Sequence, residues 1–362
     1  MDMLTAIIFI IVLGVLVFVH EFGHFIFAKR AGMKVEEFGF GFPPRIWGIK
    51  KGETMYSINW IPFGGFVKIL GEEGEQRDNP RSFSSKPAGS RLKVIIAGVT
   101  MNFFLAVALL MITNFFGLRI GLNDDKTASL ATNKQVQIIE VAKDSPADKA
   151  GIMLLDQVVG FKLNDTFNAV SSAEDVQTFI RENVGKTLTM VIQRNKETFD
   201  KEIIARVNPP AGQGALGVSL ALTGVVSYPW YEAVWRGVYD AVILTMNTII
   251  GYYILFKTLL INGKLIADVS GPIGIATLTG QAARIGINYL MQFTAMISIN
   301  LAVLNIIPFP ALDGGRALLI IIEKLKGSPV NKKAEQLVNA VGFAFLVALM
   351  LYVTAKDILR FF

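Results

Sequence analysis

Four apolar segments, each long enough to cross the hydrocarbon core of a lipid bilayer, dominate the sequence. A helix needs about 20 apolar residues to cross that core. Segments of this kind run over Leu4–Ala28, Val94–Leu118, Tyr289–Phe309 and Val338–Val353, and a fifth apolar stretch covers Ala241–Ile261. Because lipid offers no hydrogen-bond partners, such segments fold as helices. The sequence therefore predicts a multi-pass α-helical membrane protein.

The composition adds one sizeable aqueous part to this picture. Of 362 residues, 52% are hydrophobic and 18% are charged, which is too apolar for an ordinary soluble domain and too charged for a protein wholly in lipid. The absence of cysteine excludes disulfides and thiolate metal sites. The first residues, Met1–Thr5, lack the basic region of a signal peptide, so we expect the apolar run that follows to remain as a membrane anchor.

The distribution of charge predicts how the chain is oriented in the membrane. The net charge is +6, and the basic residues cluster beside apolar segments, which indicates membrane topology and no nucleic-acid binding. The loop Lys29–Lys93 carries twelve Lys/Arg and seven Asp/Glu, and Glu323–Lys333 is also basic. Basic loops face the cytoplasm. The segment Gly121–Val218 is mixed in charge and alternates in places, so we expect it to form a soluble domain on the other side.

The segment Met55–Leu70 reads MYSINWIPFGGFVKIL, with two β-prone runs on either side of Pro62, Gly64 and Gly65. This pattern predicts a β-hairpin, although the segment is unusually apolar for a loop. Two placements remain open at this point. The hairpin either packs on the helices at the surface or dips into the membrane face, where protein must bury its backbone.

Residues 20–24 read HEFGH within the first apolar segment. On a helix His20 and His24 lie one turn apart on one face, so both imidazoles can reach one metal ion. Glu21 lies beside them, where a general base belongs. Ionisable groups inside a membrane span are costly and usually functional. Since the chain has only these two histidines, we interpret them as metal ligands and not as an accidental match.

A catalytic zinc site needs a third protein ligand and an open fourth position. With no other histidine or cysteine, that ligand must be a carboxylate. Asp313 is the best candidate, because it closes an apolar segment in the sequence NIIPFPALDGG, whose prolines interrupt the helix. The alternative reading of Asp313 is a helix cap at the membrane surface. The alternative ligand is Glu323, one basic loop further on.

HEFGH on a first span together with a distant LDG resembles the site-2 protease family of intramembrane metalloproteases, specifically the bacterial regulator-of-sigma-E protease type. KVIIAG followed by Asn102, and SGPIGIA over Ser270–Ala276, resemble further segments of that family. The resemblance covers nearly the whole chain. One departure is Val99, where the family usually has proline after the Ala-Gly pair.

The resemblance implies a role for each matching residue. It implies that His20, His24 and Asp313 bind Zn²⁺ and that Glu21 activates water. It further implies that the following residues handle substrate: Asn102, Asn305, Gly64, Gly65 and Val67.

The soluble segment resembles a bacterial PDZ domain. Ser145–Ile152 is similar to its turn and short helix, although Leu155 stands where glycine is usual. Gly214–Val218 is similar to the loop and strand that grip a peptide end by strand addition. The resemblance implies that a peptide or protein ligand meets Gly214, Leu216, Gly217 and Val218. The alternative is a plain β-rich domain without a ligand.

These observations predict four transmembrane helices, a membrane-associated β-hairpin and one inserted α+β PDZ domain. The predicted divisions are 1–120 with the hairpin at 55–70, the PDZ domain at 121–222, a membrane-associated linker at 223–288, and the last two spans at 289–362. We expect Ala241–Ile261 not to cross, because a crossing there would carry Asp313 to the side opposite the histidines.

The predicted function is hydrolysis of peptide bonds within the bacterial cytoplasmic membrane, with the PDZ domain and both termini outside the cytoplasm. The expected substrates are single-span membrane proteins, of the anti-sigma factor type, or remnant signal peptides. Three alternatives stay open: a metal transporter, a non-proteolytic PDZ scaffold, and the other membrane zinc protease type, which takes a glutamate from a distant helix.

Overall fold

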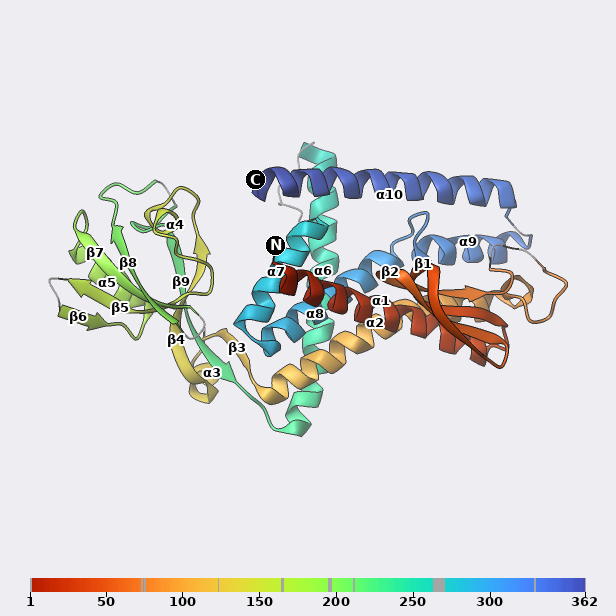
Figure 1. Ribbon diagram of the computed structural model, residues 1–362, viewed down its shortest axis with the longest axis horizontal. Coiled ribbons are helices and arrows are strands. Elements are labelled where there is room, and N and C mark those ends of the chain that lie inside the picture. The colour runs from red at the N-terminus through yellow and green to blue at the C-terminus, as the bar shows by residue number, and fades with distance from the viewer. Residues whose placement is uncertain are drawn as a thin grey trace. The chain divides into compact units, whose positions relative to one another are not determined.

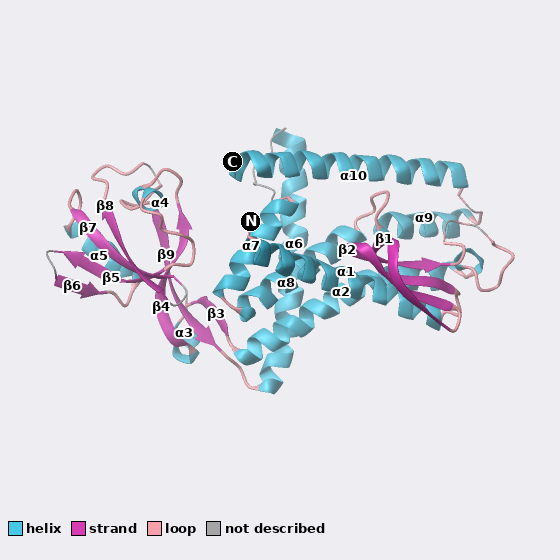
Figure 2. Ribbon diagram, in the orientation of Figure 1, coloured by secondary structure: helices cyan, strands magenta, loops and turns pink. Residues whose placement is uncertain are grey.

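The protein is described by a computed structural model covering residues 2–72, 74, 76–122, 124–163, 166–194, 197–210, 212–262, 271–328 and 330–361. It divides into two compact units. Met1–Ile112 and Val234–Phe362 form the first, and Thr113–Ala233 forms the second. The first unit is mostly helical with a small sheet, and the second is mostly β (Figures 1 and 2). Ser270, the first residue of the SGPIGIA segment, lies outside the described residues.

Each predicted apolar segment falls mostly within one helix of the first unit. The described helices of this unit are α1 (Met3–Arg30), α2 (Ala88–Phe116), α6 (Trp230–Asn262), α7 (Pro272–Ile285), α8 (Ile287–Ile306), α9 (Asp313–Lys326) and α10 (Lys332–Phe361), with a short 3₁₀ turn at Phe83–Ser85. Five of the described helices, α1, α2, α6, α8 and α10, are long and apolar enough to cross a membrane. The expected membrane-protein architecture is therefore confirmed at this level.

The third predicted segment ends earlier than its hydropathy suggests. The sequence remains apolar to Phe309, but α8 stops at Ile306. Pro308 and Pro310 cannot continue a helix, because proline lacks the backbone N–H and clashes with the preceding turn. The chain turns, and Asp313 opens the separate helix α9. Asp313 thus lies at the start of a new helix and not at the end of a span.

Small residues bring the helices of this unit close together. A Cβ at Gly23 of α1 would lie 2.5 Å from Ala97 O of α2, so only glycine permits this approach. Ser298 Oγ of α8 donates to Asn102 O of α2 at 2.7 Å. Figure 1 shows α1, α2 and α8 running alongside one another, whereas α6 runs across them.

The small sheet is built from β1 (Val35–Lys51) and β2 (Thr54–Ile69), which pair with each other along three stretches. The first half of β1 pairs on one side with residues 55–58 and on the other side with residues 65–69. The second half of β1, residues 45–51, pairs with residues 54–59. The ribbon therefore has four strand segments, in the order 45–51, 54–59, 35–40, 65–69.

The expectation that Met55–Leu70 forms a hairpin by itself is wrong. Its two runs flank the strand 35–40 and do not pair with each other in the register of the sheet. The missing partner is Val35–Phe42, whose β-prone residues lie beyond the predicted segment. One consequence is that residues 65–69 form an edge of the sheet, since their pairing partners lie on one side only.

One face of the sheet packs on α1 through aromatic rings. Phe38 of β1 lies 5.5 Å from the Phe18 ring and 5.0 Å from the Phe25 ring, measured between centroids. The edge segment continues from this packed face toward the middle of α1: a Cβ at Gly65 would lie 3.7 Å from Glu21 Cγ. The packing of the sheet therefore brings its edge beside the HEFGH turn.

The second unit is an antiparallel sheet with short helices. Its elements are β3 (Leu118–Gly121), α3 (Asp125–Leu130), β4 (Thr132–Val141), α4 (Pro146–Lys149), β5 (Gln157–Leu163), β6 (Thr166–Ala169), α5 (Ala173–Glu182), β7 (Thr187–Arg194), β8 (Glu197–Ile204) and β9 (Val218–Val226). The strand order is β3-β9-β4-β5-β7-β8, with β6 beside β5. Val136, Phe161, Leu188 and Ile192 are fully or almost fully buried in its core.

The turn at Leu155 has the backbone conformation expected for the glycine that is usual at this position. Leu155 has φ +70°, in the left-handed region that favours glycine. The strained turn is held by Asp156, which is almost fully buried and accepts from Arg194 Nε at 2.7 Å and Nη2 at 2.8 Å, and from Met153 N at 2.8 Å. The hydrogen bonds that Asp156 accepts hold the turn in place despite the unfavourable residue.

Candidate metal centre

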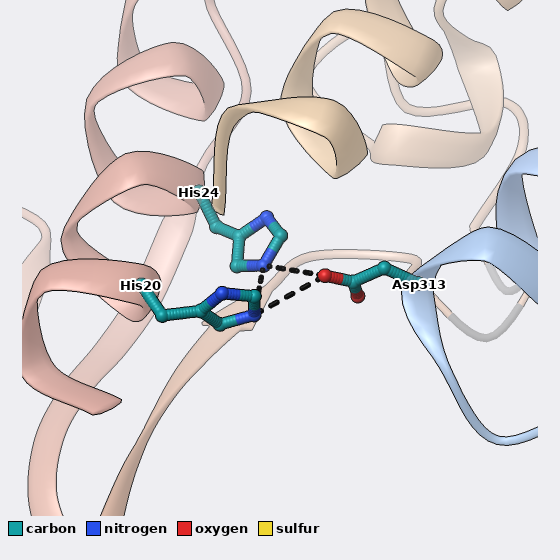
Figure 3. Close-up of side chains that lie close together, drawn as sticks. All are labelled: His20, His24 and Asp313. Atoms are coloured by element: carbon teal, nitrogen blue, oxygen red, sulfur yellow. Dashed lines mark hydrogen bonds and ion pairs between the residues drawn. The ribbon is translucent and has the colours of Figure 1, made fainter. Parts of the chain in front are cut away.

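The two histidines of the chain lie one turn apart on α1 and point the same way (Figure 3). His20 Nε2 and His24 Nε2 are 3.2 Å apart. This proximity follows from the helical period, because side chains four residues apart share one face of a helix. The long apolar run ensures that this turn is helical, and so the sequence motif becomes a pair of ring nitrogens at one point.

Asp313 reaches the same point from the first turn of α9. Its Oδ2 lies 3.2 Å from His20 Nε2 and 3.4 Å from His24 Nε2. All three ligand atoms lie within 4.8 Å of one another. The structure thus brings together the three residues that the sequence predicts as ligands.

The approach of Asp313 depends on the two glycines that follow it. A Cβ at Gly314 would lie 2.2 Å from Ile307 O, and a Cβ at Gly315 would lie 2.2 Å from Phe309 O. Neither distance is possible for real atoms, so any larger residue would push the first turn of α9 away from the preceding loop. The glycines of the LDGG sequence therefore set the position of the Asp313 carboxylate.

This group of side chains fits a catalytic metal ion. Two imidazoles and one carboxylate are the ligand types of a zinc site with an open fourth position. Asp313 Oδ2 is buried and lacks a hydrogen-bond partner of good geometry among the described residues, although it lies within ion-pair distance of both rings. A buried carboxylate oxygen is costly unless a donor or a metal compensates it. A bound cation would supply that compensation.

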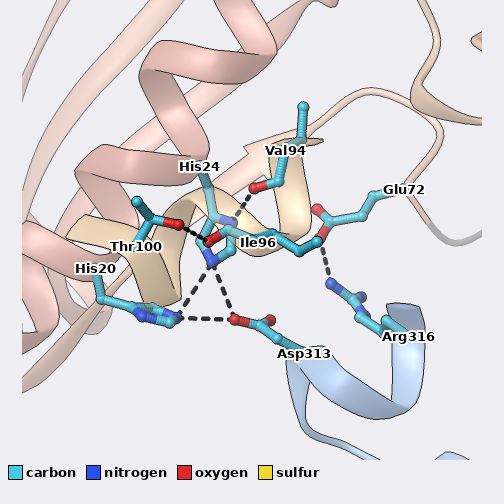
Figure 4. Close-up of polar contacts among 8 residues, drawn as sticks. All are labelled: His20, His24, Glu72, Val94, Ile96, Thr100, Asp313 and Arg316. Atoms are coloured by element: carbon cyan, nitrogen blue, oxygen red, sulfur yellow. Dashed lines mark hydrogen bonds and ion pairs between the residues drawn. The ribbon is translucent and has the colours of Figure 1, made fainter. Parts of the chain in front are cut away.

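The helix α2 holds His24 from behind. His24 is buried, and its Nδ1 donates to Val94 O at 2.8 Å (Figure 4). A hydrogen bond of this kind fixes the proton on Nδ1 and leaves the Nε2 lone pair free for a metal. The carbonyl of Val94 is a supporting group that no motif in the sequence indicates, because any residue provides a carbonyl.

Gly98 of α2 leaves the room that the two rings occupy. A Cβ at this position would lie 2.4 Å from His24 Nε2 and 2.8 Å from His20 Cε1. The side chain of any other residue would therefore overlap the metal centre itself. The sequence signal for this residue is its place in KVIIAG, but its function becomes visible only when α2 is packed on α1.

A cavity of about 210 Å³ opens beside the three ligands and has Glu21 in its wall. Phe66, Val67 and Ile69 of the sheet edge line the same cavity, as do Glu72 and Arg316. Neither member of the last pair is singled out by the sequence. A peptide that entered this cavity would meet the metal ligands, the Glu21 carboxylate and the free strand edge together.

Three other predicted substrate-handling residues, Gly64, Asn102 and Asn305, are not among the described residues that line this cavity. Gly64 has φ +119°, which only glycine adopts readily, at the bend that leads into the edge segment. Asn102 is buried on α2, and its Oδ1 has no hydrogen-bond partner among the described residues. Asn305 is half-buried near the end of α8.

Glu323, the alternative ligand, is not at the metal centre. Its carboxylate pairs with Arg91 at 2.8 Å and lies 3.9 Å from Arg77. The separation has a simple cause: Glu323 lies near the opposite end of α9 from Asp313. The choice of Asp313 as the third ligand is thus consistent with the geometry, whereas Glu323 as a ligand is wrong.

The second unit has a groove of about 620 Å³ between α5 and β9. Gly214, Leu216 and Val218 line it, together with Arg181 and Arg206. Gly217 has φ +74°, and a Cβ there would lie 2.3 Å from the Ser145 Cβ. Three of the four residues predicted to meet a PDZ ligand therefore line one groove, and Gly217 shapes the loop beside it.

Comparison with known proteins gives a consistent result. Residues 8–349 match peptidase family M50. A Clostridium perfringens protein, provisionally named as a zinc metalloprotease, is 36% identical, with 95% of each chain covered. The zinc metalloprotease RasP of Oceanobacillus iheyensis is 30% identical over 99% of this chain and 100% of its own. The regulator of sigma-W protease RasP of Bacillus subtilis is 28% identical over 99% of each chain.

We predict that Gly98→Ala weakens zinc binding by about 10- to 100-fold, the range seen when groups that support metal ligands are lost. The added methyl group overlaps His24 Nε2. The measurement is zinc affinity by competition with a chelator of known affinity. Gly89→Ala is the matched control, because it lies on the same helix and its Cβ would meet nothing within 4 Å. Equal affinity in Gly98→Ala and Gly89→Ala would contradict the prediction.

Proposed function

We propose a mechanism and a substrate class for this chain, which belongs to peptidase family M50 and is a zinc metalloprotease of the site-2 type. The observation that carries the proposal is the convergence of His20, His24 and Asp313 beside Glu21 in one cavity. These three side chains would hold the zinc ion and would leave its fourth coordination position open, as a catalytic zinc site requires.

Glu21 is the general base of the proposed mechanism. Zinc, when bound, supplies a Lewis acid that polarises the scissile carbonyl and makes water more acidic. The Glu21 carboxylate takes a proton from the attacking water and later gives it to the leaving amine. One water is added across the peptide bond, and Glu21 returns to its starting state. Its place directly after His20, in the wall of the same cavity, supports this role.

The proposed substrates are single-span membrane proteins, of the anti-sigma factor type, or remnant signal peptides. The name of the Bacillus subtilis relative, a regulator of sigma-W protease, supports such a substrate. A helical substrate hides its carbonyls in its own hydrogen bonds, so it must unwind before it is cut. The free edge of residues 65–69 offers backbone partners to an unwound segment, which would bind by strand addition. Gly64, Gly65 and Val67 belong to this edge or to the bend before it.

The second unit is proposed to be a PDZ domain that binds an extended peptide or protein segment. β3 covers only residues 223–226 of β9, so the start of β9 has a free edge beside the groove. Strand addition at this edge is the binding mode that the geometry supports. Arg181 and Arg206 would favour a ligand with negative charge.

The protein is a bacterial membrane protein, and we propose four spans with the PDZ domain and both termini outside the cytoplasmic membrane. His20 and His24 lie toward the end of α1 that meets the basic loop Lys29–Lys93, and hence in the cytoplasmic half. Asp313 must lie at the same depth. If α6 crossed between α2 and α8, Asp313 would end on the opposite side of a core about 30 Å thick. The course of α6 across α1, α2 and α8 in Figure 1 supports a helix that lies on the membrane without crossing it.

Three other functions are less well supported. A metal transporter or a scaffold would have no use for a carboxylate beside an open metal position, as Glu21 is here. A protease with a glutamate as its third ligand needs a glutamate at the histidines, whereas Glu323 pairs with Arg91. Similarity to named zinc metalloproteases also favours proteolysis.

We expect Glu21→Gln to keep zinc and to lose cleavage of a single-span reporter by at least about 10²–10⁴-fold, the contribution of a general base. Glutamine has the same shape but cannot take the proton. Zinc content and reporter cleavage would be measured on the same preparation. Cleavage at the wild-type rate would exclude Glu21 as the base.

Val67→Pro should slow reporter cleavage without lowering zinc content. Proline removes one backbone N–H from the edge that is proposed to bind substrate. Ile49→Pro is the matched control, because it makes the same change at the opposite edge of the same sheet. Strand addition at residues 65–69 would be refuted by full activity in Val67→Pro, or by equal losses in both variants.

The topology is tested by cysteine labelling, since the chain has no cysteine of its own. A membrane-impermeant reagent should label Ser227→Cys and Asn262→Cys from outside the cell, because both ends of α6 lie on that side in the four-span arrangement. Asp78→Cys, in the basic loop, should react only after the membrane is opened. Protection of Asn262→Cys until the membrane is opened would overturn the four-span proposal.

A further inference from the structure

An ion pair in the wall of the metal cavity connects the strand edge to the helix of the third ligand. Glu72 follows the edge segment 65–69, and Arg316 lies on α9. Arg316 Nη1 donates to Glu72 Oε1 (Figure 4), and both side chains line the cavity. Neither belongs to the metal ligands, and the proposed hydrolysis gives neither of them a role.

Glu72 is bonded to the end of the strand edge, and Arg316 lies on the helical turn that carries Asp313. Ile69 N, at the end of the edge segment, donates to Glu72 Oε2 at 3.4 Å. Arg316 follows Asp313 by three residues, so both lie on the same side of the first turn of α9. The glycines after Asp313 hold that turn tightly against its loop. The pair therefore joins the end of the strand edge to the helical turn that carries the Asp313 carboxylate.

A second contact in the same loop lies further from the metal. Arg77 lies 3.9 Å from Glu323, which Arg91 also binds. The loop after the strand edge thus meets α9 twice, through Glu72 at the cavity and through Arg77 outside it. The two contacts differ in their place. Arg77 and Glu323 join the loop to α9 outside the cavity, whereas Glu72 and Arg316 join it to α9 in the cavity wall.

We propose that Glu72 and Arg316 are positioning residues that set the register of the strand edge against the metal, and so select which peptide bond of a bound substrate is cut. The proposal rests on strand addition at residues 65–69, as argued for the function. Successive residues of a strand are about 3.4 Å apart, and reacting groups must be held to within about 0.5 Å. A small displacement of the edge would therefore lower the rate or bring a different peptide bond to the metal.

The test uses the full-length protein and a membrane reporter with one apolar span, in which an Asn-Pro pair interrupts the helix. Wild type and Glu21→Gln are assayed on this reporter first. The variants are Glu72→Gln, Arg316→Gln and the charge exchange Glu72→Arg with Arg316→Glu. Arg77→Gln is the matched control in the same loop. Mass spectrometry of the fragments gives the cleavage site, and zinc content is measured in parallel.

We expect each single variant to keep zinc, to cleave about 10- to 100-fold more slowly, and to produce additional cleavage sites. The charge exchange should restore the main site, and Arg77→Gln should cut only there. Three results would overturn the proposal: a wild-type rate and a single site in Glu72→Gln, loss of zinc in that variant, or no recovery by the charge exchange. Each is distinct from failure of the proposed function, which would appear as cleavage by Glu21→Gln.

Discussion

The metal centre requires three side chains from two distant parts of the chain to meet at one depth in a membrane. His20 and His24 are set by the local geometry of α1, but Asp313 has to be delivered by a different helix. The break after α8 makes this delivery possible, because the chain leaves α8, turns, and presents Asp313 on the first turn of α9. The proposed topology follows from the same requirement, since no arrangement that carries Asp313 to the other side of the membrane can form the site.

Close approach of backbones is the second requirement, and glycines satisfy it. Gly23 lets α1 touch α2, Gly98 leaves room for the two imidazoles, and Gly314 lets α9 start against its own loop. At each of these three positions, the side chain of any other residue would overlap atoms in or next to the metal centre. Packing alone would favour larger apolar residues at such positions, because they bury more surface. The centre thus depends on close approach of the backbone at these glycines.

The sequence predicted the chemistry of this centre better than its surroundings. HEFGH lies within one helical turn, so its geometry follows from local structure, and LDGG identifies Asp313 through the residues next to it. The carbonyl of Val94, the space at Gly98 and the Glu72–Arg316 pair depend on which helices and loops meet. The small sheet shows the same limit. The β-prone runs of Met55–Leu70 are visible in the sequence, but the strand with which they pair, 35–40, lies outside that segment.

The central claim is that His20, His24 and Asp313 together hold one zinc ion. Elemental analysis of the purified protein, beside His24→Ala prepared in the same way, tests it most directly. Removing one of three ligands leaves too few donors for a stable zinc site. The account predicts about one zinc per chain in wild type and a clear loss in His24→Ala. Equal zinc content in the two proteins would contradict it.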